Sequence, residues 1–503
     1  MDDKHSFVDD IKNLKEVKMI RIRVNSEMFA YDMYHITKAF YPGEVIEQSV
    51  DASCENAVEF HIEENVFLIP KEEVSGIDDR KLKKRYVNLK FYEWLSEVTR
   101  KELSWGIMTG VRPTKPMMSL MEQGLSDEEV TSWMKENYCV TDEKAKLGLK
   151  VAKREKELLE QLDYRDGYSL YVGIPFCPSI CSYCSFSSYP LAAWNHRVDA
   201  YLDAVCKELT FIAEKSRSKK LNTVYIGGGT PTTLTPGQLD RLLTHLEQHF
   251  SYENLKEITV EAGRPDSITR EKLEVLKAHN IGRISINPQT MQQKTLDIIG
   301  RKHTVEDIRR VYDMAREIGF DNINMDLIAG LPEETASDMQ DTLEQICKMS
   351  PDSLTVHALA MKRASRLNRE QKDKERTANE EAQIASTLSQ MIELASGYAS
   401  QMNLQPYYLY RQKNIAGNFE NVGYAKVDKA GIYNILIMEE KQSIIAVGAG
   451  ASTKIVLPDE KVIIDQKTGN PKRIVRSENV RDVEQYISRI DEMIERKEEL
   501  LWH

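Results

Sequence analysis

Six short runs rich in β-branched and aromatic residues alternate with helical patterns between residues 169 and 359. Alternation of this kind builds a parallel sheet whose crossover helices cover its outside. Six units are too few for a closed eight-unit barrel, so we predict an α/β fold with a partial (β/α)6 barrel. Its active site should lie at the C-terminal ends of the strands. The expected strands are 169–174, 222–228, 257–263, 282–288, 322–328 and 353–359, and the expected helices are 198–215, 236–250, 270–280, 304–318 and 333–349.

Three domains are expected. Residues 1–165 should form an N-terminal α+β and helical domain, 166–375 the barrel, and 376–503 a C-terminal α+β extension. In the first, we predict strands at 18–24 and 57–69, helices at 32–40 and 142–162, and a structured loop at WGIMTGVRPTK, 105–115, where two glycines and a proline interrupt the helical pattern. In the last, we predict a helix at 377–400, a hairpin of 432–437 with 443–447, and a helix at 483–500.

Composition limits the class of protein. With 41% hydrophobic and 29% charged residues the chain reads as a globular protein. A net charge of −11 argues against a nucleic-acid partner, which calls for a basic domain or stripe. The acidic first 17 residues contain no apolar segment, and no run approaches 18 apolar residues, so neither a signal peptide nor a transmembrane helix is expected. A cytoplasmic location is therefore predicted.

Three cysteines gather where the first barrel strand ends. In YVGIPFCPSICSYCSF, residues 171–186, Cys177, Cys181 and Cys184 have C-x₃-C-x₂-C spacing, and Phe186 stands where a fourth might. Thiolates at such short spacings are ligands of iron–sulfur clusters. A cubane held by three of them keeps one iron open to another ligand. The alternatives are a zinc knuckle or three unrelated buried cysteines, but no second cysteine pair or histidine partner follows. The remaining cysteines are scattered and predicted to be small buried hydrophobes: Cys54, Cys139, Cys206 and Cys347.

Polar residues and glycines mark the ends of the later strands. GGGTPT, 227–232, ends the second strand, and its glycines allow close approach of backbone to a ligand, although a tight turn or a phosphate cradle has the same composition. Glu261 ends the third strand and Gln289 follows the fourth, whereas Arg301 lies between helices and Asp326 lies within the fifth strand. Buried polar groups need partners. A ligand is one possibility, and a structural ion pair between Glu261 and Arg301 is another.

The cysteine spacing, with Tyr183 before the last cysteine, resembles the radical S-adenosylmethionine (SAM) superfamily. That resemblance implies a [4Fe–4S] cluster on Cys177, Cys181 and Cys184, with SAM bound to its open iron. The ordered motifs YVGIPFC, GGGTPT and DLIAGLP further resemble the oxygen-independent coproporphyrinogen III oxidases, and the 105–115 loop resembles their HemZ-type branch. By resemblance the residues expected to contact SAM are Tyr171, Tyr183, Gly228, Gly229, Thr230, Glu261, Gln289, Arg301 and Asp326.

The implied activity is oxidative decarboxylation of coproporphyrinogen III to protoporphyrinogen IX in heme biosynthesis, with electrons from a low-potential donor such as flavodoxin or ferredoxin. Two departures concern the substrate: Phe186 replaces the fourth cysteine of the major branch, and EAGRPD, 261–266, differs from the expected segment. A heme chaperone of the same family and a radical SAM methyltransferase acting on heme are therefore kept as alternatives.

The substrate carries four propionates, so its pocket should contain arginine or lysine. Most such residues are solvated surface charges, and His357 in the sixth strand is at least as well explained as a core histidine. No catalytic side chain is assigned. The candidates for binding propionates are Arg112, Lys115, Lys362, Arg363 and Arg411.

Overall fold

Six parallel strands follow one another across the sheet in the order of the sequence. In the computed structural model these are β5 (Gly167–Ile174), β8 (Lys220–Gly228), β9 (Glu257–Glu261), β10 (Arg283–Ser285), β11 (Ile323–Ala329) and β12 (Ser353–Ala358). Each pairs in parallel with the next, and most of their residues are buried. Apolar, β-branched strands of this kind are covered on both faces. The predicted (β/α)6 arrangement is confirmed, and the described strands do not close into a complete barrel.

The structure describes residues 19–42, 44–359, 378–411, 419–458, 461–464 and 471–502. These fall into two compact units. Unit 1 contains the described residues of 19–149 and 378–389 together with 411 and 419, and unit 2 contains those of 150–359, 390–410 and 420–502.

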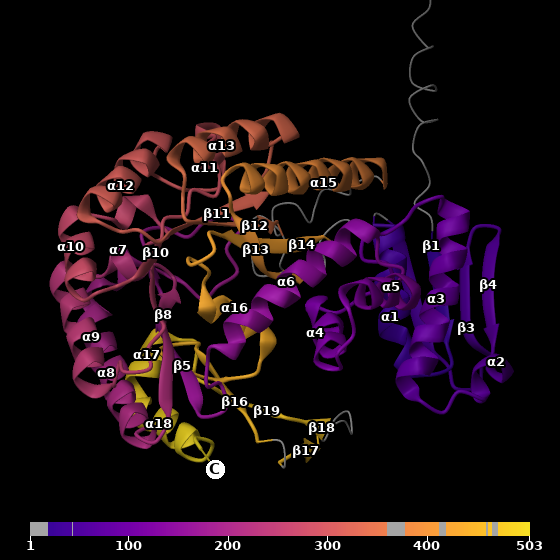
Figure 1. Ribbon diagram of the computed structural model, residues 1–503, viewed down its shortest axis with the longest axis horizontal. Helices are drawn as coiled ribbons and strands as arrows, with labels where there is room; N and C mark the ends of the chain where they lie inside the picture. Colours follow the sequence, from indigo (N-terminus) through magenta and orange to yellow (C-terminus); the bar gives the residue numbers. More distant parts are fainter. Residues whose placement is uncertain are drawn as a thin grey trace, which may run out of the picture. The chain divides into compact units, whose positions relative to one another are not determined.

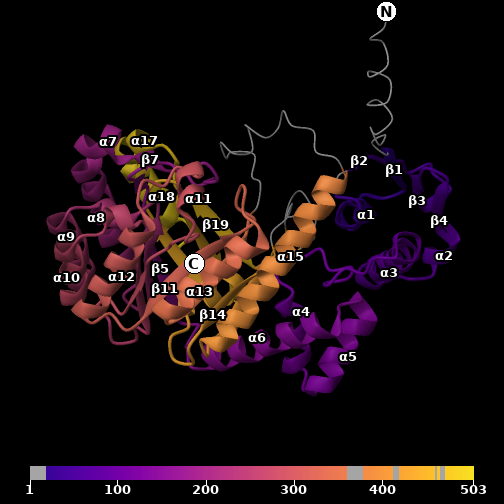
Figure 2. The same cartoon turned by 90° about the horizontal axis from the view of Figure 1, so that it is seen from above.

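Helices on the outside of the sheet follow the strands in turn, as Figures 1 and 2 show. Their starts are encoded locally, because Thr235, Thr304 and Thr335 each cap a helix with their hydroxyl and receive a side chain from the third helical residue in return. The helices are α7 (Leu191–Trp194), α8 (Val198–Lys215), α9 (Pro236–His249), α10 (Arg270–Ala278), α11 (Gln293–Ile298), α12 (Val305–Ile318) and α13 (Ala336–Met349).

The C-terminal part extends the same sheet at both edges. β15 (Ser443–Val447) pairs in parallel with β5, and β14 (Glu420–Ala425) pairs antiparallel with β12. The predicted hairpin is wrong, because residues 432–437 lie in a helix, α16 (Ile432–Glu439). The predicted C-terminal helix is two helices. Remaining elements of this part are α15 (Ala378–Gln401), β13 (Gln405–Arg411), β16 (Ser452–Val456), β17 (Ile463–Ile464), β18 (Pro471–Lys472), β19 (Ile474–Glu478), α17 (Val483–Ser488) and α18 (Ile490–Glu498).

Unit 1 contains a four-stranded sheet in the order β2-β1-β3-β4, with an apolar core that includes Ile22, Phe29, Phe60 and Phe91. The strand predicted at 57–69 is two strands, which turn at Glu63, a residue with φ of 51°. The strands are β1 (Met19–Val24), β2 (Val45–Val50), β3 (Asn56–Ile62) and β4 (Asn65–Pro70). The helices before the barrel are α1 (Glu27–Phe40), α2 (Lys71–Ser75), α3 (Arg80–Thr99), α4 (Thr114–Glu122), α5 (Asp127–Tyr138) and α6 (Asp142–Glu160). Across the described part of the chain, no helix combines the length and apolar character needed to cross a membrane.

Candidate functional site

The three cysteines lie on the loop that follows β5. Cys177 ends the short strand β6 (Phe176–Cys177), which pairs with β7 (Tyr189–Pro190) and so closes the loop. Hydrogen bonds to a distant segment also hold the loop: Ser182 N donates to Ile299 O at 3.0 Å, and Ser179 Oγ donates to Gly300 O at 3.2 Å. Sequence positions about 120 residues apart therefore hold the cysteine loop at the C-terminal ends of the strands.

The three cysteines of this loop are close to one another, with Cys181 buried and the other two half-buried. Burial raises the pKa of Cys177 to about 11 and raises that of Cys184, and charges on the neighbouring thiols act in the same direction. Thr230 Oγ1 donates a hydrogen bond to Cys177 Sγ at 3.5 Å. Since metal binding requires thiolates, loading of this site releases protons.

The donor set fits an iron–sulfur cluster. Among the residues that the structure describes, no three His, Cys, Asp or Glu side chains converge tightly enough to hold one metal ion. The fit therefore rests on chemistry: three neighbouring thiols, with an arginine N–H directed at the sulfur of Cys181 at 3.4 Å. Thiolates that receive hydrogen bonds are typical ligands of such clusters.

The glycines that end β8 allow it to close against the start of the cysteine loop. Gly229 N donates to Ile174 O at 2.7 Å, and a Cβ at Gly229 would lie 2.7 Å from Phe176 O. Gly228 has φ of +111°, and a Cβ there would meet backbone of Ile174 at 3.2 Å and the Tyr171 hydroxyl at 3.3 Å. Backbone of this part of the chain fills the space that side chains would need.

Glu261, at the end of β9, carries its carboxyl beneath these glycines. Oε1 accepts a hydrogen bond from Tyr225 Oη at 2.6 Å, and Oε2 accepts one from Gly228 N at 3.3 Å. Burial, with the nearby charge of Asp326, raises the pKa of Glu261 to about 7. Tyr171 and Tyr225 each stack on Tyr433 of α16, with ring centroids 6.3 and 4.4 Å apart. A cationic ligand group would find a poised acceptor here.

A backbone hydrogen bond joins Gln289 to Asp326. Gln289 has φ of 67°, and its backbone N donates to Asp326 O at 2.9 Å. Asp326 Oδ1 accepts from Asn324 Nδ2 at 2.8 Å and lies 4.0 Å from His357 Nε2. His357 is in turn 3.1 Å from Tyr410 Oη. The Asp326 carboxyl and the His357 imidazole therefore face each other across β11 and β12, and the backbone of Gln289 lies beside β11.

Arg301 does not form the ion pair with Glu261 that was kept as an alternative. Its Nη1 donates to Asn287 O at 2.5 Å and its Nη2 to Tyr183 Oη at 3.2 Å, whereas Glu261 has the partners given above. The alternative is wrong because backbone and phenol groups, not a carboxylate, surround the guanidinium.

Two of the expected ligand-binding side chains have a buried polar atom that the described residues leave without a hydrogen-bond partner. These atoms are Gln289 Oε1 and Arg301 Nε. Unpaired buried polar atoms are rare in native structures and call for an explanation. A polar ligand such as SAM supplies amino, carboxylate and hydroxyl groups that would give these two atoms hydrogen-bond partners. The residues present therefore fit SAM as a ligand.

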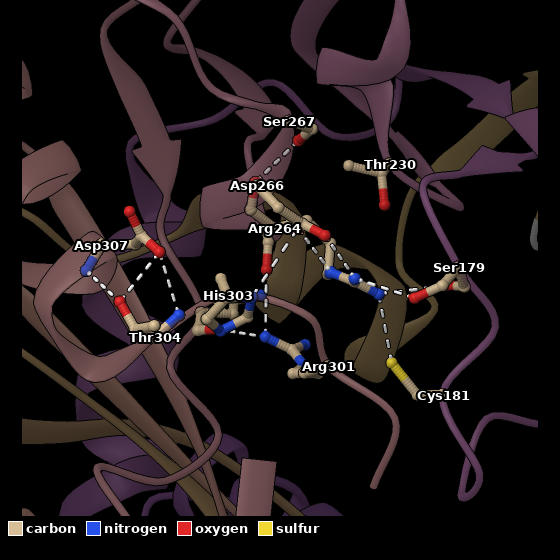
Figure 3. Close-up of polar contacts among 12 residues, drawn as sticks. Ser179, Cys181, Thr230, Arg264, Asp266, Ser267, Arg301, His303, Thr304 and Asp307 are labelled. Atoms are coloured by element: carbon tan, nitrogen blue, oxygen red, sulfur yellow. Dashed lines mark hydrogen bonds and ion pairs between the residues drawn. The ribbon is translucent and has the colours of Figure 1, made fainter. Parts of the chain in front are cut away.

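Three residues near the cysteines were not found from the sequence. Arg264, Asp266 and His303 form a chain of contacts that ends at Cys181, as Figure 3 shows. Burial would raise the pKa of Asp266, but the neighbouring His303 and the hydrogen-bonded Arg264 guanidinium hold it well below its usual range. The available signal was EAGRPD itself, in which an arginine and an aspartate directly follow a buried strand.

The substrate-side candidates are placed differently. Arg112 is half-buried and Lys115 exposed, both in unit 1. Arg411 is 2% exposed, donates to Met108 O and lies over the Trp105 ring. Lys362 and Arg363 lie outside the described residues.

Comparisons with known proteins place the chain in one family. Residues 171–346 match the family described as the radical SAM superfamily. The chain is 42% identical over 417 residues to the "Oxygen-independent coproporphyrinogen-III oxidase-like protein HemZ" of Bacillus subtilis (strain 168), which covers 82% of this chain and 79% of that protein.

Other relatives match over a smaller part of the chain. "Heme chaperone HemW" of the same organism is 36% identical over 192 residues, 38% of this chain and 50% of that protein. The "Oxygen-independent coproporphyrinogen III oxidase" of Salmonella typhimurium is 34% identical over 188 residues, 37% of this chain and 41% of that protein. In both, the match spans half or less of the relative. The solved coproporphyrinogen III oxidase (HemN) from Escherichia coli shares the fold, with a TM-score of 0.50 at 22% identity over 67% of this chain and 73% of that one.

Proposed function

The chain belongs to the radical SAM superfamily, among the oxygen-independent coproporphyrinogen-III oxidase-like proteins, and on this premise we propose that it oxidatively decarboxylates coproporphyrinogen III to protoporphyrinogen IX. The observation that carries the proposal is the length of the similarity. An alignment of 417 residues reaches far beyond the 171–346 span that the superfamily shares. The proposal includes a cytoplasmic location and a low-potential electron donor such as flavodoxin or ferredoxin.

Membership of the superfamily implies a [4Fe–4S] cluster and SAM. In the proposal, Cys177, Cys181 and Cys184 hold the cluster. When bound, cluster and SAM together supply a carbon-centred radical that can take a hydrogen atom from an unactivated carbon. The role of this chain is to bind and orient the cofactors and the substrate and to exclude water from them.

The polar residues of this site suit the groups that SAM presents. Glu261 and Asp326 offer carboxylates to its ammonium or hydroxyl groups, and the Arg301 guanidinium can donate to its carboxylate. We expect the same SAM site to be bordered by the backbone of Gly228 and Gly229 and by the hydroxyl of Thr230. Thr230 also contacts Cys177. Tyr183 completes this side through its hydrogen bond with Arg301.

Each of the two reacting propionates of the substrate loses a β-hydrogen atom, CO₂ and one electron, and an acceptor must take that electron. The remaining propionates require cationic partners, and Arg112 and Lys115 are proposed for this role. Lys362 and Arg363 are kept as further candidates. Arg411 is proposed only as a residue that supports the 105–115 loop from within, because Met108 O and the Trp105 ring already surround its guanidinium.

The proposal is tested by incubating the anaerobically reconstituted protein with coproporphyrinogen III, SAM and a strong reductant. Mass spectrometry should show loss of about 92 Da from the substrate, for two CO₂ and four hydrogens, because the cofactors carry out the bond cleavage. Asp326→Ala should retain the iron and lose SAM affinity. A protein that cleaves SAM and leaves coproporphyrinogen intact would contradict the assignment.

A heme chaperone is the second candidate, because this chain is 36% identical over 192 residues to a protein of that name. Titration with heme separates the two functions. A chaperone binds heme stably and forms no product from coproporphyrinogen, whereas the proposed enzyme forms protoporphyrinogen IX and need not bind heme.

A further inference from the structure

Arg264 is a buried arginine whose donors face the cysteine loop. It is 4% exposed and belongs to EAGRPD, directly after β9. Its Nη1 donates to Ser179 O at 3.1 Å and to Cys181 Sγ at 3.4 Å, and its Nη2 donates to Ser179 Oγ at 3.0 Å. One guanidinium therefore holds both the backbone of the loop and the sulfur of one cysteine (Figure 3).

The orientation of this guanidinium is fixed from behind. Asp266 accepts from Arg264 Nε at 2.9 Å and from Nη2 at 2.7 Å, which is the bidentate geometry that suits a guanidinium. His303 Nδ1 lies 3.7 Å from Asp266 Oδ1, and Ser267 Oγ donates to Arg264 O at 2.7 Å. The carboxylate occupies one edge of the guanidinium and leaves Nη1 directed at the sulfur.

We propose that Arg264 is a positioning residue that raises the reduction potential of the cluster held by Cys177, Cys181 and Cys184, and that Asp266 moderates this effect. The inference rests on the proposed function, because it requires those cysteines to hold the cluster.

The physical reason is the charge of the reduced state. Reduction adds an electron to the cluster and its thiolates, so an N–H donor and a positive charge beside a ligating sulfur stabilise the reduced form. Burial strengthens the interaction, because the effective dielectric constant is low there. Asp266 carries the opposite charge, and its position behind the guanidinium offsets part of the effect.

Two substitutions should therefore move the potential in opposite directions. Arg264→Gln removes the cation and leaves Asp266 near the cluster, so the midpoint should become more negative. Asp266→Asn leaves the cation without its counter-charge, so the midpoint should become more positive. A merely structural role would loosen the loop in both variants and would not produce shifts of opposite sign.

The test is an EPR-monitored redox titration of anaerobically reconstituted full-length protein. Arg264→Gln should lower the ratio of reduced to oxidised cluster at least tenfold at a fixed poise, which is about 59 mV for a one-electron couple. Arg264→Lys, which keeps the charge without the fork, should lie between this variant and wild type. Arg270→Gln is the matched control, since Arg270 is exposed and pairs with Glu317 on the outside.

The outcomes are distinguishable. Equal midpoints in fully loaded wild type, Arg264→Gln and Asp266→Asn, or shifts of the same sign in both variants, overturn the inference. If Arg264→Gln fails to retain iron, the inference is tested by the midpoint potentials of Arg264→Lys and Asp266→Asn, which should shift in opposite directions from wild type. If wild type itself takes up no cluster, the proposed function fails first, whereas a loaded and active wild type with unshifted variants refutes this inference alone.

Discussion

Replacing Glu261 by Gln should stabilise the ligand-free protein at alkaline pH while weakening SAM binding. The pKa of Glu261 is raised from 4.5 to about 7 by burial first and by Asp326 second. That difference of about 2.5 pH units corresponds to at most roughly 3 kcal/mol, at 1.36 kcal/mol per unit, that folding spends on burying the ionised carboxyl.

The sign follows from proton binding. Between about pH 4.5 and 7 the folded state holds a proton at Glu261 that the unfolded state has lost, so stability falls as pH rises through this window. Gln is neutral at every pH and keeps an acceptor for Tyr225, but it loses the bond from Gly228 N, which costs about 1 kcal/mol. The variant should therefore be about 2 kcal/mol more stable than wild type at pH 8 and slightly less stable at pH 5.

The assay compares midpoints of denaturant unfolding for the reduced, cluster-free protein from pH 5 to pH 8, with exposed Glu274→Gln as control. In the cluster-loaded protein, calorimetry should show SAM affinity reduced by roughly 10- to 100-fold, since a hydrogen bond to a charged group contributes about 1.5–3 kcal/mol. Wild type and Glu261→Gln with the same pH dependence would refute the reasoning, because the carboxyl would then carry no burial cost.

Three further substitutions test other parts of the account. Cys181→Ala should lose most iron and sulfide, whereas Cys206→Ala should keep both, as measured by metal analysis; a full cluster in the first variant would contradict the ligand assignment. Gly229→Ala should destabilise the protein by about 1–3 kcal/mol, because the added Cβ meets backbone at 2.7 Å, while Gly237→Ala, with open space around its Cβ, should not lower the melting temperature. Lys497→Met should cost about 3–5 kcal/mol in unfolding experiments, because it leaves a fully buried glutamate 2.6 Å away without its cation; an unchanged melting temperature would show that this pair is dispensable.

Local sequence signals were sufficient where the structure is set locally. The six barrel strands and their helices could be predicted because apolar β-branched runs are interrupted by capping threonines such as Thr235 and Thr304. The turn at Glu63 could not, because Glu63 and Glu64 lack the Gly or Asn signature of a hairpin.

Contacts between residues far apart in the sequence determine the features that the sequence alone did not predict. IYNILI at 432–437 is equally apolar as strand or helix, and it becomes helical where Ile432 N at the helix start donates to buried Glu257 Oε2 at 2.5 Å. The sequence did predict that Glu261 ends a strand and that Asp326 lies within one, as they do in β9 and β11. The role of Arg264 could not be predicted, because it depends on Asp266 and on a loop that begins 85 residues earlier with Ser179.

The most direct test of the central claim is the fate of the propionate β-hydrogen. Coproporphyrinogen III with deuterium at the propionate β-carbons is incubated anaerobically with the reconstituted protein, SAM and reductant. The account predicts deuterium in 5′-deoxyadenosine together with formation of protoporphyrinogen IX, because the radical supplied by the cofactors takes that hydrogen. Cleavage of SAM without deuterium transfer, or transfer without any decarboxylated product, would contradict it.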